Sequence, residues 1–187
     1  PIVRVAWNDA VLVKRVLDAG ATTVMFPFVQ NAEEAARAVA ATRYPPQGVR
    51  GMAGMSRAAK YGTQADYLTT ANRQMSVIVQ LETEAALAEL EAIAQVDGVD
   101  ALFIGPADLS GSMGLPGQIT HPRVMKAMAD AARRCRALGK PVGSIGTQGA
   151  VVAQYRAAGY DYLAIGSDLG LFVDAAQCAI ASMRGSE

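Results

Sequence analysis

The chain has 187 residues, 51% of them hydrophobic, and its 17 Lys and Arg residues balance 17 Asp and Glu residues. A chain of this length can bury the core of one globular domain. The zero net charge disfavours binding to nucleic acid or to a membrane surface, because both usually require an excess of basic residues. No apolar run approaches the length of a membrane span. The two distant cysteines, Cys135 and Cys178, are typical packing residues of a reduced, cytoplasmic protein.

Apolar runs rich in β-branched residues alternate with helical patterns along the whole chain. We expect strands at residues 2–5, 23–26, 77–79, 101–104, 142–145 and 162–165. We expect helices at residues 9–19, 32–41, 65–72, 84–94, 122–138 and 148–158, and a last one from about 167 to 183. This alternation predicts a parallel sheet in a single α/β domain that spans residues 1–187.

The length of the chain favours one α/β architecture over another. A TIM (β/α)8 barrel takes about 250 residues, or roughly 31 residues per unit, so six units would take about 186. The sequence therefore predicts a TIM barrel whose first two βα units are absent from an N-terminally truncated chain, since residues 2–5 already have a strand pattern. A doubly wound sheet stays open, although no Gly-rich dinucleotide-binding motif follows any expected strand.

Local signals mark the ends and faces of the expected helices. Asn31 is expected to be an N-cap, and a glycine follows three of the helices directly before a strand, at Gly20, Gly139 and Gly159. The first helix should bury the apolar stripe formed by Val11, Leu12, Val16 and Ala19.

A long loop is expected from Arg43 to about Gly62, because its prolines and glycines exclude a helix or a central strand. Long loops in compact domains tend to be functional. Tyr44, Arg57 and Tyr61 therefore either line a site or fix the loop in place.

Two carboxylates follow neighbouring expected strands. Glu82 follows the run at residues 77–79, and Gln80 lies two residues earlier, so both side chains should project from the same face. Asp108 follows the strand at 101–104. Two carboxylates at adjacent strand ends would suit Mg²⁺ or Mn²⁺, with positions left open for a substrate. An equally good interpretation is local: Glu82 would favour the start of the next helix and Asp108 would cap a short turn.

Two further charged residues are candidates for chemistry. Arg4 interrupts an apolar strand and needs an anion, which is either a substrate carboxylate or oxyanion, or a structural ion-pair partner. His121 is the only histidine, and its place before Pro122 at a helix start is more typical of a cap than of a general base.

The sequence resembles the HpcH/HpaI aldolase family over essentially its whole length, and most closely its 2-keto-3-deoxy sugar acid and 4-hydroxy-2-oxoheptanedioate aldolases. The motifs that carry the resemblance are residues 3–5 (VRV), 42–51 (TRYPPQGVRG), 79–82 (VQLE), 103–109 (FIGPADL) and 166–170 (GSDLG). The resemblance implies a class II aldolase on a TIM barrel. Such an enzyme uses a divalent metal, Mg²⁺ or Mn²⁺ and possibly Co²⁺, and cleaves 4-hydroxy-2-oxo acids to pyruvate and an aldehyde.

The resemblance also implies roles for particular residues. Glu82 and Asp108 would ligate the metal, Gln80 and the backbone near Ala107 would contact pyruvate, and Arg4 would stabilise the enolate. Asp18 matches a carboxylate that tunes a catalytic histidine. That histidine belongs to the family's first two units, so the general base is unassigned within residues 1–187. The long loop around Arg57, together with a neighbouring subunit, would select the aldehyde.

The resemblance further implies a homo-oligomer, a hexamer in which the last helix is exchanged between subunits. Two other functions stay open from the sequence. One is an acyl-CoA lyase similar to the citrate lyase β subunit, which shares the paired carboxylates and the metal. The other is a non-catalytic barrel fragment that binds pyruvate or oxalate without turnover.

Overall fold

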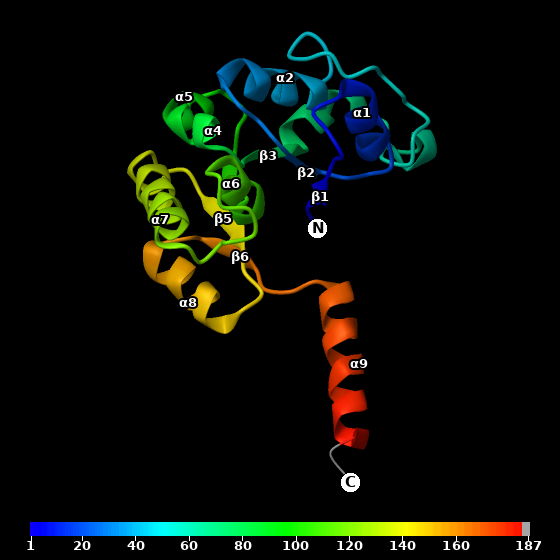
Figure 1. The fold of residues 1–187 in the computed structure, drawn as a ribbon. Helices are drawn as coiled ribbons and strands as arrows, with labels where there is room; N and C mark the ends of the chain where they lie inside the picture. Colours follow the sequence, from blue (N-terminus) through cyan, green and yellow to red (C-terminus); the bar gives the residue numbers. More distant parts are fainter. Residues whose placement is uncertain (185–187) are drawn as a thin grey trace.

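The computed structural model describes residues 1–184, which form one six-stranded parallel sheet with the strands in sequence order. The strands are β1 (Val3–Arg4), β2 (Thr23–Phe26), β3 (Ser76–Leu81), β4 (Ala101–Ile104), β5 (Val142–Ile145) and β6 (Tyr162–Ala164). The sheet curls, and helices cover its outer face (Figure 1). The predicted α/β class and parallel sheet are confirmed, and the curled sheet is consistent with a half-barrel of the TIM type.

The helices follow the predicted order with two differences. They are α1 (Ala10–Asp18), α2 (Ala32–Thr42), α3 (Tyr67–Thr70), α4 (Glu84–Ala88), α5 (Leu90–Ala94), α6 (Pro106–Ser112), α7 (Pro122–Ala137), α8 (Gly149–Ala158) and α9 (Asp168–Arg184), with 3₁₀ turns at Lys60–Gly62 and Ala71–Gln74. The helix expected at residues 84–94 is divided at Glu89 into α4 and α5. Helix α6, directly after β4, was not predicted as a helix.

The predicted helix ends agree with the structure. The side chain of Asn31 accepts a hydrogen bond from the backbone N–H of Glu34 at 2.9 Å, as an N-cap does. Gly20, Gly139 and Gly159 all have positive φ angles, which glycine adopts without steric conflict.

Alternation along the strands gives the sheet two different faces. Val77, Val79 and Leu81 of β3 belong to the main core under the helices. On the inner, concave face, Ile78 packs in a small cluster with Met25, Ala101, Phe103 and Tyr162. Because side chains alternate with a period of two, Gln80 and Glu82 belong to the same inner face as Ile78.

The predicted buried stripe of α1 is wrong for Val11, Leu12 and Ala19, which are exposed, whereas Val16 is half-buried against the core. Val13 and Leu17 are the residues of α1 that are buried against the core, whereas Val11 is 68% exposed and Leu12 is 37% exposed. Helix α1 is apolar on two sides. The side that faces the sheet carries Val13 and Leu17, which are four residues apart. Leu12, Val16 and Ala19 instead line a groove beside Arg4 at the edge of β1.

The long loop lies at the end of the sheet opposite to Glu82. A helix that follows a parallel strand runs back toward the amino ends of the strands, and the loop joins the end of α2 to the segment that precedes β3. Two hydrogen bonds fix it there: Tyr44 N donates to Asn72 Oδ1 at 2.7 Å, and Asn72 Nδ2 donates to Tyr44 O at 3.0 Å. Buried Tyr44 therefore fixes the loop, and Arg57 lies away from the Glu82 end of its own chain.

A buried ion pair connects this loop to α1. The fully buried side chain of Arg50 donates to Asp18 Oδ1 at 2.8 Å and to the Tyr67 hydroxyl at 3.3 Å, and its guanidinium lies 4.4 Å from the centre of the Tyr44 ring. Burial raises the pKa of Asp18, but hydrogen bonds from Arg50 and Lys14 outweigh this effect and hold the pKa below its ordinary value.

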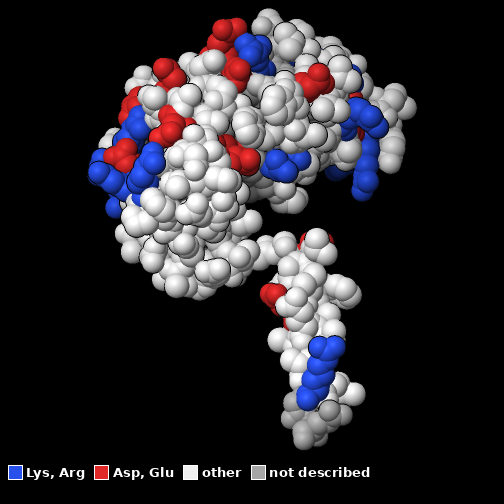
Figure 2. Space-filling model, in the orientation of Figure 1, with Lys and Arg blue, Asp and Glu red and all other residues white. Residues whose placement is uncertain are grey.

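Helix α9 projects away from the sheet and its covering helices (Figure 1). None of its residues is buried, and its exposed apolar side chains include Leu169, Phe172, Ile180 and Met183. Figure 2 shows charged side chains gathered over α4, α5 and α7 and few on α9. Within residues 1–184, no helix is both long and apolar enough to cross a membrane. Cys135 is buried as predicted, whereas Cys178 lies exposed on α9.

Removal of the Asp18 carboxylate tests the buried pair. Asp18→Ala would leave Arg50 buried without a counter-charge, so we expect the free energy of unfolding to fall by about 3 kcal/mol, the lower end of the range for buried pairs because Asp18 is partly exposed. Urea denaturation measures this. Glu33→Ala, which breaks the exposed pair with Arg37, should change stability by less than about 0.5 kcal/mol.

The pH dependence gives a second readout of the same pair. Because the folded pKa of Asp18 is lowered, its contribution is complete above the ordinary value of 3.8 and is lost as the pH falls through the folded value. The stability difference between wild type and Asp18→Ala should therefore shrink in acid. A difference that persists at the lowest pH values would contradict the ionic explanation.

Candidate active site

The structure brings Glu82 and Asp108 together at the carboxyl edge of the sheet. Glu82 directly follows β3, and Asp108 lies in the first turn of α6, which follows β4. The two strands are neighbours, with Leu81 paired to Ile104. Glu82 is only 4% exposed, whereas Asp108 is exposed to solvent. Ligands of parallel α/β proteins bind at this edge of the sheet.

Glu82 lies directly before the next helix but does not cap it, because a different residue is the N-cap. The Thr83 side chain accepts a hydrogen bond from Ala86 N at 3.0 Å and is the N-cap of α4. The carboxylate of Glu82 instead packs against Gly105, where an added Cβ would lie 2.7 Å from Glu82 Oε1. Residue 105 must therefore lack a side chain for Glu82 to keep this position.

The environment of Glu82 disfavours an isolated negative charge. Burial, followed by repulsion from Asp108, raises the pKa of Glu82 above its ordinary value. The main-chain N–H of Phe28 and the charge of Arg4 act in the opposite direction, but do not cancel the shift. A buried carboxylate next to a second carboxylate is the arrangement that a bound cation would stabilise.

Arg4 and Gln80 are available to a ligand on the same inner face. Arg4 is exposed and has no ion-pair partner among residues 1–184, so the structural ion-pair interpretation is not supported there. Gln80 is buried, and its Oε1 atom has no hydrogen-bond partner within the described chain. Both side chains could therefore contact a small polar molecule beside Glu82.

The start of α6 adds main-chain donors near Asp108. Pro106 occupies the first helical position and no side chain caps the helix. The N–H groups of Ala107 and Asp108 are thus the first ones of α6, and N–H groups at this position can bind an anion.

The donor set fits a hard divalent cation. The described residues contain no group of three or more His, Cys, Asp or Glu side chains that could hold a metal. Two carboxylates are nevertheless sufficient for Mg²⁺, which keeps several waters and accepts oxygen atoms from the substrate. The orphaned Oε1 of Gln80 and the unfavourable burial of Glu82 agree with such an occupant.

Two other sequence candidates do not join this site within one chain. Asp18 lies at the end of α1, toward the amino edge, and its oxygens are held by Lys14 and Arg50. His121 Nδ1 accepts a hydrogen bond from Arg123 N at 3.2 Å, which confirms the predicted cap of α7. Gly105 and Phe28, which both lie against Glu82, are not among the residues that the sequence predicts for the site. Only Gly105 has a local signal, since it directly follows β4.

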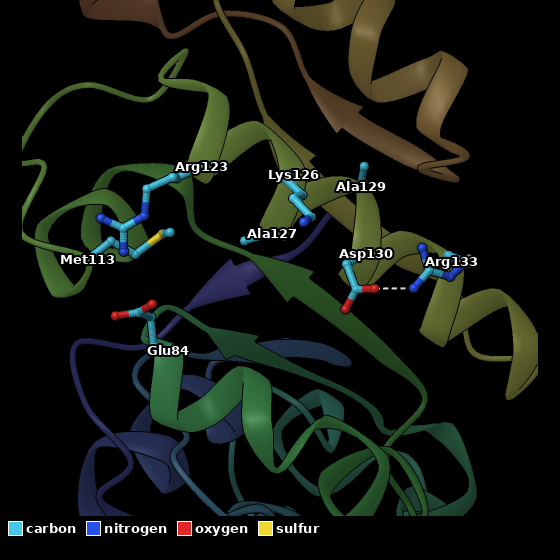
Figure 3. A pocket seen from close by; sticks show the side chains of 8 residues that line it. All are labelled: Glu84, Met113, Arg123, Lys126, Ala127, Ala129, Asp130 and Arg133. Atoms are coloured by element: carbon cyan, nitrogen blue, oxygen red, sulfur yellow. Dashed lines mark hydrogen bonds and ion pairs between the residues drawn. The ribbon is translucent and has the colours of Figure 1, made fainter.

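A hollow of about 560 Å³ lies elsewhere, on the helical side of the sheet (Figure 3). Glu84 at the start of α4 faces Arg123 and Lys126 of α7 across it, and Asp130 pairs with Arg133 at its rim. Its charges are exposed and of both signs. It contains neither Glu82 nor Asp108, so it is not the candidate active site.

Comparisons with known proteins agree with this site. A family profile described as HpcH/HpaI aldolase/citrate lyase matches residues 1–175, and the chain belongs to this family. It is 48% identical over 187 residues to the 2-dehydro-3,6-dideoxy-6-sulfogluconate aldolase of Pseudomonas putida. The aligned region covers 100% of this chain and 73% of that protein. It is 45% identical to the 4-hydroxy-2-oxo-heptane-1,7-dioate aldolase of Salmonella paratyphi B, over 100% of this chain and 71% of that protein.

A solved structure supports the fold as well. The HpcH/HpaI aldolase/citrate lyase family protein of Burkholderia cenocepacia J2315 superposes with a TM-score of 0.94 and 45% identity. The match covers 98% of this chain and 73% of that one. The predicted family is thus confirmed, and the named relatives are aldolases.

Substitution of Gly105 tests the close contact with Glu82. Gly105→Ala should displace the Glu82 carboxylate, weaken binding of a divalent cation at least about tenfold, and lower the free energy of unfolding by about 1–3 kcal/mol through overpacking. Gly111→Ala is the matched control, because a methyl group there meets no atom within 4 Å. Mn²⁺ titration and urea denaturation measure both effects. Unchanged Mn²⁺ affinity in Gly105→Ala would show that this contact does not shape the site.

Proposed function

We propose that the protein is a class II aldolase that reversibly cleaves 4-hydroxy-2-oxo acids, of the 2-keto-3-deoxy sugar acid type, to pyruvate and an aldehyde. The observation that carries the proposal is the buried Glu82 carboxylate beside Asp108, with Arg4 and the orphaned Gln80 on the same face. The names of the relatives support aldol cleavage as the reaction.

Glu82 and Asp108 would hold the divalent metal, with Mg²⁺ or Mn²⁺ as the best fit to two carboxylates and Co²⁺ as a further candidate. When bound, such an ion supplies a Lewis acid that polarises the keto group of the substrate. The role of the protein is to keep both carboxylates at one point of the sheet edge, where each follows a rigid strand.

The remaining residues would bind and orient the substrate. The N–H of Ala107 at the start of α6 suits the carboxylate of pyruvate, and Gln80 would fix the orientation of the molecule. Asp108 would contact pyruvate as well. The unpaired guanidinium of Arg4 would stabilise the negative charge that develops on the keto oxygen as the C3–C4 bond breaks.

The positions of the lysines support a metal mechanism over a Schiff base. The chain has four lysines. Lys14 pairs with Asp18 at the end of α1, Lys60 lies in the long loop, Lys126 lines the outer hollow, and Lys140 contacts Val99 O. None of these positions is on the inner face beside Glu82, where an imine-forming lysine would have to lie.

We also propose a homo-oligomer, a hexamer in which α9 is exchanged between subunits. The exposed apolar side chains of α9 support this, since a projecting helix of this kind requires a partner surface. A neighbouring copy would then supply the contacts that select the aldehyde, including the long loop around Arg57. Asp18 lies away from Glu82 in its own chain. Its catalytic role would therefore also be at the site of a neighbouring copy.

The architecture proposed for the complete fold is a (β/α)8 barrel. Strands β1 and β6 are the two edges of the sheet, and two further βα units between them would close it. No observation favours an acyl-CoA lyase over the aldolase.

Metal removal and a change of Glu82 test the function directly. EDTA should abolish cleavage of a 2-keto-3-deoxy sugar acid, and Mn²⁺ should restore it, because the keto group is not polarised without the ion. Glu82→Gln should weaken Mn²⁺ affinity at least about 100-fold. Glu84→Gln is the matched control, two residues away and outside the site, and should bind as wild type does.

Three results would count against the proposal. Cleavage that survives complete chelation would exclude the metal mechanism. Equal Mn²⁺ affinities for wild type and Glu82→Gln would remove Glu82 from the site. Binding of pyruvate together with Mn²⁺ but no cleavage of any 4-hydroxy-2-oxo acid would favour a binding protein over an aldolase.

A further inference from the structure

The segment after β2 lies across the end of β3 on both sides of Glu82. Val29 N donates to Gln80 O at 3.1 Å, and the Thr83 hydroxyl donates to Gln30 Oε1 at 2.6 Å. Gln80 and Thr83 flank Glu82 in the sequence. The two contacts therefore place Phe28, which lies just before Val29 and Gln30, opposite the Glu82 side chain.

The hydrogen-bond ladder between β2 and β3 skips Phe28. Ser76 N donates to Thr22 O at 2.8 Å, and Phe26 pairs with Val79. Parallel ladders repeat every two residues, so the regular donor to Gln80 O would be the N–H of Phe28. The actual donor is Val29. Phe28 is thus an inserted residue, a bulge, and bulges beside active sites redirect groups.

The backbone of Phe28 has an unusual conformation. Its φ angle is +55°, in the left-handed region that a bulky residue seldom adopts. The Phe28 ring stacks on Trp7, with ring centres 6.0 Å apart and an interplanar angle of 26°. Such conformations persist only where surrounding contacts impose them, and they gather at functional sites.

The N–H that the bulge releases from the ladder is used at the candidate site. The main-chain N–H of Phe28 interacts with the Glu82 carboxylate and lowers the pKa of that group. A hydrogen bond to a ligating carboxylate fixes its orientation and leaves its other lone pairs for a cation.

We propose that Phe28 is a positioning residue: its left-handed bulge directs a main-chain N–H at Glu82 and holds that carboxylate in the orientation that a divalent cation requires. This inference rests on the proposed function, since it assigns Glu82 to the cation. The Trp7 ring supports the bulge from the side of β1. The conformation of residue 28 is the essential feature, and the aromatic ring is secondary.

Two substitutions separate conformation from side chain. Asn adopts the left-handed region more readily than other non-glycine residues, whereas β-branched Val is strongly disfavoured there. Phe28→Val should weaken Mn²⁺ affinity about 10- to 100-fold, and Phe28→Asn should stay within about threefold of wild type although it lacks the ring. Electron paramagnetic resonance of free Mn²⁺ measures the affinities, and thermal melts confirm that each variant is folded.

The outcomes distinguish this inference from the proposed function. Equal losses in Phe28→Val and Phe28→Asn would assign the effect to the ring and overturn the inference, as would wild-type affinity in Phe28→Val. If Glu82→Gln abolishes binding in the same assay, the proposed function stands in either case. If wild type binds no Mn²⁺, both fall.

A backbone substitution covers the case in which Phe28→Val does not fold. Replacement of Phe28 by phenyllactic acid exchanges only the N–H for an ester oxygen and keeps the ring. The affinity for Mn²⁺ should again fall about 10- to 100-fold. Unchanged affinity of the ester would overturn the inference.

Discussion

The burial of one carboxylate is the constraint on which the rest of the site depends. Glu82 is 4% exposed and lies beside a second acid, so its ionised form needs compensation from its surroundings. Gly105 leaves space for it, the main-chain N–H of Phe28 interacts with it, and Arg4 contributes a positive charge. Together with Glu82, these groups come from the ends of β1, β2 and β3 and from the turn after β4. A parallel sheet with its strands in sequence order is what brings them to one edge.

The charged residues at the two edges of the sheet have different environments. At the carboxyl edge, charged groups are left unpaired or poorly compensated, which is typical of sites that bind a ligand. At the amino edge, Arg50 is buried in a cluster with Asp18, Tyr44 and Tyr67 that joins the long loop to α1. That cluster contributes to stability. Within one chain, the charged residues at the carboxyl edge therefore form the candidate active site, and those at the amino edge form a buried ion-pair cluster.

The sequence predicted those features that depend on local pattern. Runs of β-branched residues placed the strands, and the two-residue period placed Gln80 and Glu82 on one face. Three features were missed for physical reasons. The place of the long loop at the amino edge of its own chain follows from the returning direction of α2, which the local sequence of the loop does not show. Helix α6 is short and starts at Pro106, so it gave no helical periodicity. The bulge at Phe28 has no sequence signal, because tertiary contacts impose a left-handed conformation on a residue that disfavours it.

The most direct test of this account is the position of the metal. Crystals of the protein grown with Mn²⁺ and pyruvate, measured at the manganese absorption edge, would locate the ion by anomalous scattering without any assumption about activity. We expect one strong peak coordinated by a carboxylate oxygen of Glu82 and one of Asp108, with pyruvate oxygens completing the shell. A peak at other side chains, or pyruvate bound beside Arg4 with no manganese peak between the two carboxylates, would contradict it.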